Sequence, residues 1–342
     1  MKNAITRFAA LGERLSHFGE EPLSREIIAR ACRENPWFSP QEVRRAVQAL
    51  VREMLQSDKL QSWLAAYPAL PVKKPAEVLV IMAGNIPLVG FFDLLCVVAS
   101  GHRCRIKPSA KDRVLMEYVV QQLRDIDPEL PVTFSTDADN APDAVIATGS
   151  DNANRYFRAR YAGIPTLLRG HRQSVAVLSG AESPEQLAGL ADDIWSYSGL
   201  GCRNVSMLFL PEGYRPELRM PAVSPKYRNN YLQTRALLAM QHRPMLDLGA
   251  AIAVEQREFP TALSELSYSC YRTADEVAAW LAEHDAELQC VVTECLDHPR
   301  RVAFGRAQSP ALTDYPDARD VMAWLSDITP RTDSEETSNH DL

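Results

Sequence analysis

Residues 76–109, AEVLVIMAGNIPLVGFFDLLCVVASGHRCRIKPS, contain the change of pattern that decides the fold. A β-branched run at 77–81 is followed by an apolar segment of helical length and then by a second short run at 103–107. The same alternation of short apolar runs and helix-length segments continues toward residue 180 and returns beyond it. Because strands separated by helices are typical of parallel sheets, the sequence predicts an α/β protein.

The alternating pattern divides into two lobes, and the residues at the two ends of the chain do not follow it. Residues 1–75 carry apolar side chains at helical spacing, and one helix is expected to open with Ser39 as N-cap, Pro40 next and Glu42 three residues after the cap. We therefore expect a helical N-terminal region over 1–75. A first α/β lobe should cover 76–180, completed by 300–328, and a second should cover 181–299. The acidic, aperiodic residues 329–342 are predicted to be a disordered tail.

Length and charge narrow the classes of function. The 342 residues suffice for two hydrophobic cores. The 37 basic and 44 acidic residues give a net charge of −7, which argues against nucleic acid as a partner. No window of about 18 residues is free of charged or polar groups, and the first residues lack the apolar run of a signal peptide. We therefore expect a cytoplasmic protein without a membrane span.

The seven cysteines form an odd set, with no CxxC pair and no histidine at ligand spacing. Neither a disulfide framework nor a metal site is therefore predicted. Cys96, Cys270 and Cys290 lie in apolar or strand-like runs and are expected to be core residues. Cys202 differs, because glycines and an Arg-Asn pair surround it in SYSGLGCRNVSMLFLP, 196–211, just before an apolar strand.

Three strand-to-loop junctions place polar groups at the carboxyl edge of the predicted sheet, where ligands bind in open α/β folds. AGN (83–85) ends the first strand, and its asparagine either projects into a cleft or caps a turn. KPS (107–109) ends the second strand, although a lysine alone is more often a solvated surface residue. TGS (148–150) precedes a helix whose unpaired amides suit a phosphate. The chain contains no GxGxxG fingerprint.

Taken together, these segments resemble the aldehyde dehydrogenase superfamily and, within it, the LuxC-type acyl-CoA reductases. The resemblance implies an aldehyde-dehydrogenase-like fold, with a Rossmann-type cofactor lobe and a second α/β lobe that carries Cys202. The segments that carry it span nearly the whole chain: ENPWFSPQEVRRAV (34–47), AGNIPLVGFFDLL (83–95), RIKPS (105–109), IATGS (146–150), LLRGHRQSVAVL (167–178), SGLGCRNVSMLFLPEGY (198–214) and FGRAQSPALTDYPDARDVMAWL (304–325).

The resemblance also implies a role for each matched residue. Cys202 matches the nucleophile of the family's GCRN loop, and a thiolate is the group that exchanges with a thioester. Asn85 matches the side-chain amide of the oxyanion hole. The matched cofactor contacts are Lys107 and Ser109 at the adenosine ribose, and Thr148, Gly149 and Ser150 at the pyrophosphate turn.

Two departures from the wider superfamily bear on the reaction. Arg169 or Gly170 stands where oxidising aldehyde dehydrogenases carry a water-activating Glu, so an acyl-enzyme thioester should persist. Ala110 and then Lys111 stand where NAD-preferring relatives carry a Glu for the ribose 2′-hydroxyl, which favours NADPH over NADH. The hypothesis is NADPH-dependent reduction of a fatty acyl-CoA to the aldehyde through an acyl-cysteine on Cys202, with CoA as the leaving group.

Three other functions stay open. A Cys-dependent acyltransferase or acyl carrier would use the same thiolate without a dinucleotide. An NAD-dependent aldehyde dehydrogenase would form an acid without CoA. A non-catalytic scaffold would not require Cys202, Asn85 and Lys107 together. The resemblance is compatible with a homodimer and with a partner enzyme that activates acyl groups.

Overall fold

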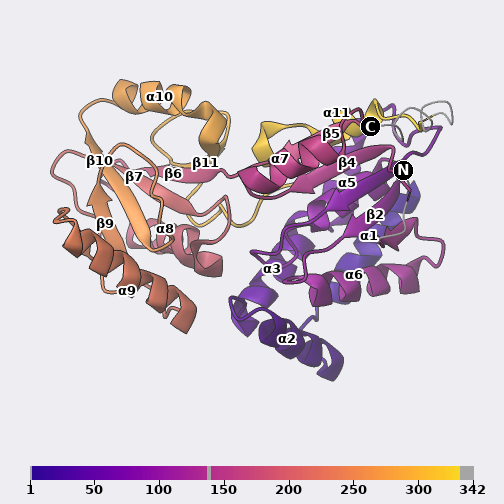
Figure 1. Cartoon of the computed structure of the whole chain (residues 1–342), viewed down its shortest axis with the longest axis horizontal. Helices are drawn as coiled ribbons and strands as arrows, with labels where there is room; N and C mark the ends of the chain where they lie inside the picture. Colours follow the sequence, from indigo (N-terminus) through magenta and orange to yellow (C-terminus); the bar gives the residue numbers. More distant parts are fainter. Residues whose placement is uncertain (1, 137–139, 332–342) are drawn as a thin grey trace.

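The computed structural model describes residues 2–136 and 140–331 and contains two sheets, each flanked by helices. Figure 1 shows the sheets side by side in two lobes, with the N-terminal helices packed on the first lobe. The predicted α/β architecture with a helical N-terminal region is confirmed. Among the described residues, none of the helices combines the length and the apolarity that crossing a membrane requires.

The first sheet has five parallel strands in the order β3-β2-β1-β4-β5. The chain winds outward from β1 to β3 and then returns to pair β4 with the other side of β1, so the winding direction reverses between β1 and β4. Ligands of open α/β sheets bind outside the carboxyl ends of the strands at such a point. The strands are β1 (Glu77–Ile81), β2 (Arg103–Lys107), β3 (Val132–Phe134), β4 (Ala144–Thr148) and β5 (Thr166–Arg169).

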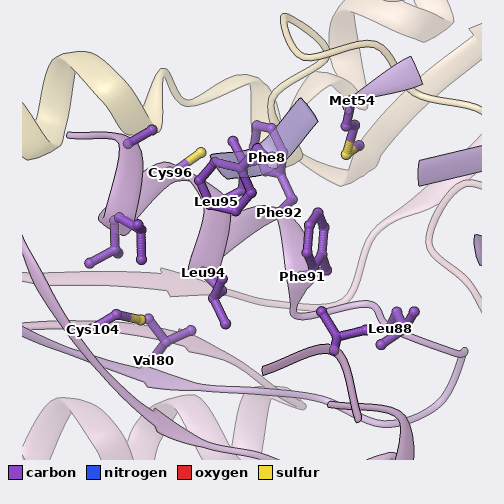
Figure 2. Close-up of a cluster of buried hydrophobic side chains, with 14 of the residues drawn as sticks. Phe8, Met54, Val80, Leu88, Phe91, Phe92, Leu94, Leu95, Cys96 and Cys104 are labelled. Carbon is purple, nitrogen blue, oxygen red and sulfur yellow. The ribbon is translucent and has the colours of Figure 1, made fainter. Parts of the chain in front are cut away.

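Helices cover the two faces of this sheet unequally. One face packs against a large core that Figure 2 shows around Phe91, Leu94 and Leu95, and every residue of α5 is buried there. The other face carries a smaller cluster in which Leu79 and Val145 pack beneath α7. The helices that follow the first strands are α5 (Phe91–Ala99), α6 (Arg113–Ile126) and α7 (Asp151–Arg160).

Four helices form the N-terminal region, as predicted. The expected cap of α3 is present, since Ser39 Oγ accepts a hydrogen bond from the Glu42 amide at 3.2 Å. Apolar residues of these helices, such as Phe8 and Leu64, are buried in the core of the first lobe. The helices are α1 (Lys2–Leu15), α2 (Pro22–Glu34), α3 (Pro40–Glu53) and α4 (Ser57–Ala65).

The second sheet has seven strands in the order β12-β11-β6-β7-β10-β9-β8, all parallel except the β8 and β9 pair. Helix α8 packs on one face and α10 on the other, as Figure 1 shows. The strands are β6 (Gln173–Val177), β7 (Val205–Pro211), β8 (Leu246–Asp247), β9 (Ile252–Glu255), β10 (Glu265–Tyr271), β11 (Leu288–Val292) and β12 (Arg301–Val302). The helices of this lobe are α8 (Pro184–Trp195), α9 (Pro225–Met240) and α10 (Ala274–Glu283), with short 3-10 turns η1 (Ser196–Gly199) and η2 (Asp285–Glu287). Further along the chain follow η3 (Pro316–Ala318) and α11 (Val321–Ser326), and α11 packs on the first lobe.

The boundaries of the lobes differ from the expected ones in three places. Strand β6 pairs with β7 and β11, so the chain enters the second sheet between β5 and β6 rather than after residue 180. The segment 300–328 crosses between the lobes, because Ala307 packs in the second core whereas Leu312 and α11 pack in the first. Of the predicted tail, residues 329–331 are described, and the Arg331 amide donates to Asp143 Oδ1 at 2.8 Å. The remaining tail, 332–342, lies outside the described residues.

Candidate active site

Cys202 lies in the loop between η1 and β7, immediately after a left-handed turn. Tyr197, Ser198 and Gly199 have φ angles of 54°, 55° and 68°. A residue with a side chain costs roughly 1–2 kcal/mol in this region, because its Cβ approaches the following carbonyl oxygen. Only Gly199 adopts it without that cost. Other contacts must therefore hold this turn in place.

Two buried polar side chains fix the loop around the thiol. Asn204 Oδ1 accepts a hydrogen bond from the Gly201 amide at 2.8 Å, while its Nδ2 donates to the Ser196 carbonyl at 2.9 Å. Ser174 Oγ, at the start of β6, donates to the Cys202 carbonyl at 2.9 Å. Hydrogen bonds to an amide and to a carbonyl of this loop therefore hold it on the second lobe.

Asn85 reaches this loop from the first lobe. It follows β1, and its Nδ2 donates to the Leu200 carbonyl at 2.6 Å, two residues before the candidate nucleophile. The buried Asn35 carboxamide supports the same turn by donating to the Gly84 carbonyl at 3.3 Å. The structure thus brings the two predicted catalytic residues, Asn85 and Cys202, to one place.

An apolar cavity of about 160 Å³ opens on the Cys202 side chain. Helix α3 supplies one wall, the β1–α5 loop a second, and the segment 308–316 a third. The polar groups at its rim include Arg203, Gln289 and Gln308. Its apolar lining residues are Ala46, Ala49, Leu50, Met54, Ile86, Pro87, Leu88, Val89, Phe92, Pro310, Ala311 and Pro316.

Cys202 lines this cavity and is exposed to solvent, although many protein atoms surround its sulfur. Burial of the sulfur raises the pKa of Cys202 to about 11, although the Arg203 and Arg169 guanidinium groups act in the opposite direction. Arg203 is pointed toward the segment 307–314, where its Nη2 lies 3.3 Å from the Asp314 carbonyl. Arg203 also lines the cavity that Cys202 lines.

Arg169 is one of the two residues, with Gly170, that stand where the resemblance places the water-activating Glu. It ends β5, is 5% exposed, and its Nη1 donates to Asp93 Oδ2 at 2.6 Å. This ion pair raises the pKa of Arg169 against the opposing effect of burial, so the group stays cationic. A buried, paired guanidinium accepts no proton, and Gly170 beside it has no side chain to do so.

The predicted cofactor residues lie at the carboxyl edge of the first sheet, in two groups. Ser109 packs against Gly84, where a Cβ on the glycine would lie 2.6 Å from Ser109 Oγ and 3.1 Å from Lys111 Cβ. Lys107 lines a cavity of about 340 Å³ on the α7 side of the sheet, together with Arg105 and Arg160. That cavity does not include the 148–150 turn.

The second group, 148–150, connects β4 to α7. Ser150 is the N-cap of α7, and its Oγ accepts from the Ala153 amide at 3.3 Å. Thr148 pairs with Arg169 across β4 and β5, and the Gly149 amide donates to the Arg169 carbonyl at 3.2 Å. A Cβ on Gly149 would lie 3.0 Å from the Ala153 Cβ, so a larger residue would push against the helix. The turn therefore has a structural role whether or not a phosphate binds there.

The edge offers features that a nicotinamide dinucleotide would use. The winding direction reverses between β1 and β4, α7 begins at this edge, and Lys107 supplies a cation. Residues that sequence reasoning gave no role include Asn35, Ser174 and Asn204. All three lie inside the quoted family-like segments, which was the signal available for them.

Comparison with known proteins agrees with this geometry. Residues 25–219 match the family model "Acyl-CoA reductase (LuxC)". A long-chain acyl-protein thioester reductase from Aliivibrio fischeri is 26% identical over 200 residues, covering 50% of this chain and 42% of the relative. A second such reductase, from Photobacterium leiognathi, is 28% identical over 151 residues, covering 39% of this chain and 31% of the relative. The matches thus span less than half the length of these curated relatives.

Solved structures show the same fold at low identity. An aldehyde dehydrogenase from Bacillus cereus with NAD+ superposes with a TM-score of 0.60 at 15% identity, covering 81% of this chain and 68% of that one. Aldehyde dehydrogenase 21 from Physcomitrella patens gives a TM-score of 0.64 at 12% identity, covering 95% and 84%. Since the family model matches more than half of the residues, the chain belongs to the LuxC acyl-CoA reductase family, on an aldehyde dehydrogenase fold.

Proposed function

We propose that this chain reduces an acyl thioester to the aldehyde, accepting the acyl group of an acyl-CoA on Cys202 and using NADPH as the reductant. The observation that carries the proposal is one junction, at which Asn85 of the first lobe touches the Cys202 loop of the second beside an apolar cavity. A thiol, an amide donor and a place for a hydrocarbon chain are what thioester exchange requires.

In the first step, Cys202 Sγ forms a bond to the thioester carbonyl carbon, and the bond from that carbon to the CoA sulfur breaks. CoA leaves as the thiol and takes up the proton that Cys202 gives away. Negative charge develops on the carbonyl oxygen meanwhile. Asn85 Nδ2 has a second hydrogen beyond the one that Leu200 accepts, and it is available to this oxygen together with the Cys202 amide.

The cavity lining accounts for selection of an acyl group. A dry cavity of about 150 Å³ is large enough for benzene, so about 160 Å³ holds the carbons nearest the carbonyl. Apolar burial of those carbons contributes about 0.8 kcal/mol for each methylene. A long chain would continue beyond this space, and Met54, which follows the last residue of α3, is a flexible residue at its wall.

The fate of the acyl group depends on the residues and the cofactor next to the acyl-cysteine thioester. Neither Arg169 nor Gly170 can act as a general base, so no carboxylate at this position activates water against the acyl-cysteine. When bound, NADPH would supply the hydride that, with one proton, converts the acyl-cysteine into the aldehyde and restores the thiol. Lys107 and Ser109 would hold its adenosine end and the turn 148–150 its pyrophosphate. Lys111, beside Gly84 at the same edge, supports the choice of the 2′-phosphorylated form.

A protein-bound acyl donor is the second candidate for the substrate. The two curated relatives are named as reductases of long-chain acyl-protein thioesters. The chemistry at Cys202 is the same for both donors, since each presents a thioester carbonyl. The difference lies in the group that leaves, which is CoA in one case and a thiol of the donor protein in the other.

The test is NADPH oxidation at 340 nm with acyl-CoAs of increasing length, with aldehyde measured in parallel and NADH as the comparison. We expect aldehyde to equal the NADPH consumed, and both to disappear in Cys202→Ala. Acyl transfer to Cys202 without consumption of dinucleotide would instead establish an acyltransferase. Oxidation of added aldehyde to the acid without CoA would establish an aldehyde dehydrogenase.

A further inference from the structure

Asp112 stands at the N-cap position of α6, yet within the described residues its side chain makes no capping hydrogen bond. An aspartate at this position usually accepts a hydrogen bond from an amide of the first helical turn. Here Asp112 Oδ2 instead accepts the Leu88 amide, at 2.8 Å, from the loop that joins β1 to α5. Both residues are buried. The side chain therefore links two loops of the first lobe rather than stabilising its own helix.

The surroundings of this carboxyl group are unfavourable. Among the described residues, Asp112 Oδ1 is buried without a hydrogen-bond partner, so only one of the two oxygens is satisfied. Burial raises the pKa of Asp112 well above its usual range, although the hydrogen bond from the Leu88 amide acts in the opposite direction. Native structures contain few buried polar atoms without a partner, and each of them calls for an explanation. The contact with Leu88 supplies one, because the helix does not.

Leu88 needs the contact that Asp112 provides. Its φ angle is 57°, in the left-handed region, where the Cβ of a residue approaches the following carbonyl oxygen. Such a conformation persists only where the surrounding structure imposes it, and a hydrogen bond to a buried acceptor is a constraint of this kind. The Leu88 side chain lines the cavity that opens on Cys202. Asp112 therefore holds one wall residue of the acyl cavity in a conformation that the chain would otherwise avoid.

The same loop carries Asn85 between two anchored positions. Immediately before it, the Gly84 carbonyl accepts a hydrogen bond from Asn35 Nδ2 at 3.3 Å. Three residues after it, the Leu88 amide donates to Asp112. From between these points, the Asn85 side chain reaches the loop of the nucleophile. Loss of the Asp112 anchor would let the oxyanion donor and the cavity wall move together relative to the thiol.

We propose that Asp112 is a positioning residue of the active site, which holds the loop 85–88 so that Asn85 and the cavity wall keep their places beside Cys202. The inference rests on the proposed function for the roles of Asn85 and Cys202. Asp112 acts on the acyl group and the thiol only through its neighbours. Its own amide donates to the Ser109 carbonyl at 3.0 Å, so Asp112 also joins this loop to the turn proposed to hold the adenosine ribose.

The experiment measures acylation of Cys202 by acyl-CoA in a single turnover without NADPH, followed by intact-protein mass spectrometry. Asp112→Ala removes the acceptor, whereas Asp112→Asn keeps an oxygen for the Leu88 amide in a side chain of the same shape. We expect acylation to slow roughly a hundredfold in Asp112→Ala, because a displaced donor loses the geometry of the transition state, and to stay close to the wild-type rate in Asp112→Asn. Ser224→Ala, which removes the cap of α9 in the second lobe, controls for a general loss of stability and should leave the rate unchanged.

A second readout separates positioning from a general disturbance of the site. Alkylation of Cys202 by iodoacetamide needs no oxyanion donor, and Ser174 and Asn204 hold the Cys202 loop on the other lobe. The alkylation rate in Asp112→Ala should therefore be close to that of the wild type. Alkylation that slows in parallel with acylation would overturn the proposal, as would equal acylation rates in Asp112→Ala and Ser224→Ala.

One measurement on the wild type keeps the test decisive if Asp112→Ala folds poorly. Hydrogen exchange resolved to single amides should show the Leu88 amide strongly protected, because its acceptor is buried. An unprotected Leu88 amide would overturn the proposal. A wild type that takes up no acyl group would instead contradict the proposed function, and the exchange of Leu88 would still test the anchor.

Discussion

The environment of Cys202 predicts an unusual pH profile for its reactivity. Burial disfavours the charged thiolate, so the pKa is raised to about 11 and the protonated thiol is the form present at neutral pH. At pH 7 about one thiol in ten thousand is then ionised, against about one in thirty for an ordinary cysteine with a pKa of about 8.5. Since the thiolate is the nucleophile, Cys202 should react roughly 300-fold more slowly than a model thiol at this pH.

The assay is alkylation of the ligand-free protein by iodoacetamide between pH 6 and 10, with Cys202 followed by peptide mass spectrometry and a cysteine-containing peptide as the reference. From pH 7 to 9 the rate at Cys202 should rise about a hundredfold, while the reference rises roughly 25-fold and approaches its plateau. Cys202→Ala identifies the modified peptide. A Cys202 rate that levels off below pH 8 would refute the reasoning, because it would mean that Arg203 and Arg169 outweigh burial.

Three other predictions follow from individual contacts. Asn85→Ala should lower kcat by about a hundred- to a thousandfold through loss of an oxyanion donor, measured by steady-state NADPH oxidation, and an unchanged kcat would remove Asn85 from the site. Lys107→Met should raise KM for NADPH with little effect on kcat, whereas substitution of the exposed Lys74 by Met should change neither. Equal effects of the two substitutions would exclude a specific contact between Lys107 and NADPH. Asn204→Ala leaves the Gly201 amide and the Ser196 carbonyl without their partner, so the free energy of unfolding in urea should fall by about 1–3 kcal/mol. A fall below about 0.5 kcal/mol, the size of a typical surface substitution, would contradict this account.

Much of the first lobe was predictable because its strands are short, apolar and separated by helices. Strands β1, β2 and β4 follow from the runs at 77–81, 103–107 and 144–148, and the Ser39 cap follows from a local signal. Helix α9 was not predicted, because the apolar side chains of residues 225–240 do not line one face of a helix. Ser224 and Pro225 form a start signal for a helix that was available in the sequence.

The candidate site was predictable only in part. The resemblance pointed to Cys202 and Asn85, which the structure brings together where the two lobes meet. The hydrogen bond from Arg45 on α3 to Ser196 was not predictable, since it joins residues that are 151 positions apart in the chain. That β6 belongs to the second sheet was also not predictable, because the sequence of a parallel strand does not show which sheet the strand joins.

The central claim is that an acyl group passes through Cys202 and leaves as an aldehyde. The most direct test is intact-protein mass spectrometry in a single turnover, with the protein mixed with acyl-CoA first and with NADPH second. The account predicts an adduct of the acyl mass on Cys202 that NADPH removes with release of one equivalent of aldehyde. An adduct that NADPH leaves in place, or one that is released as the free acid, would contradict it.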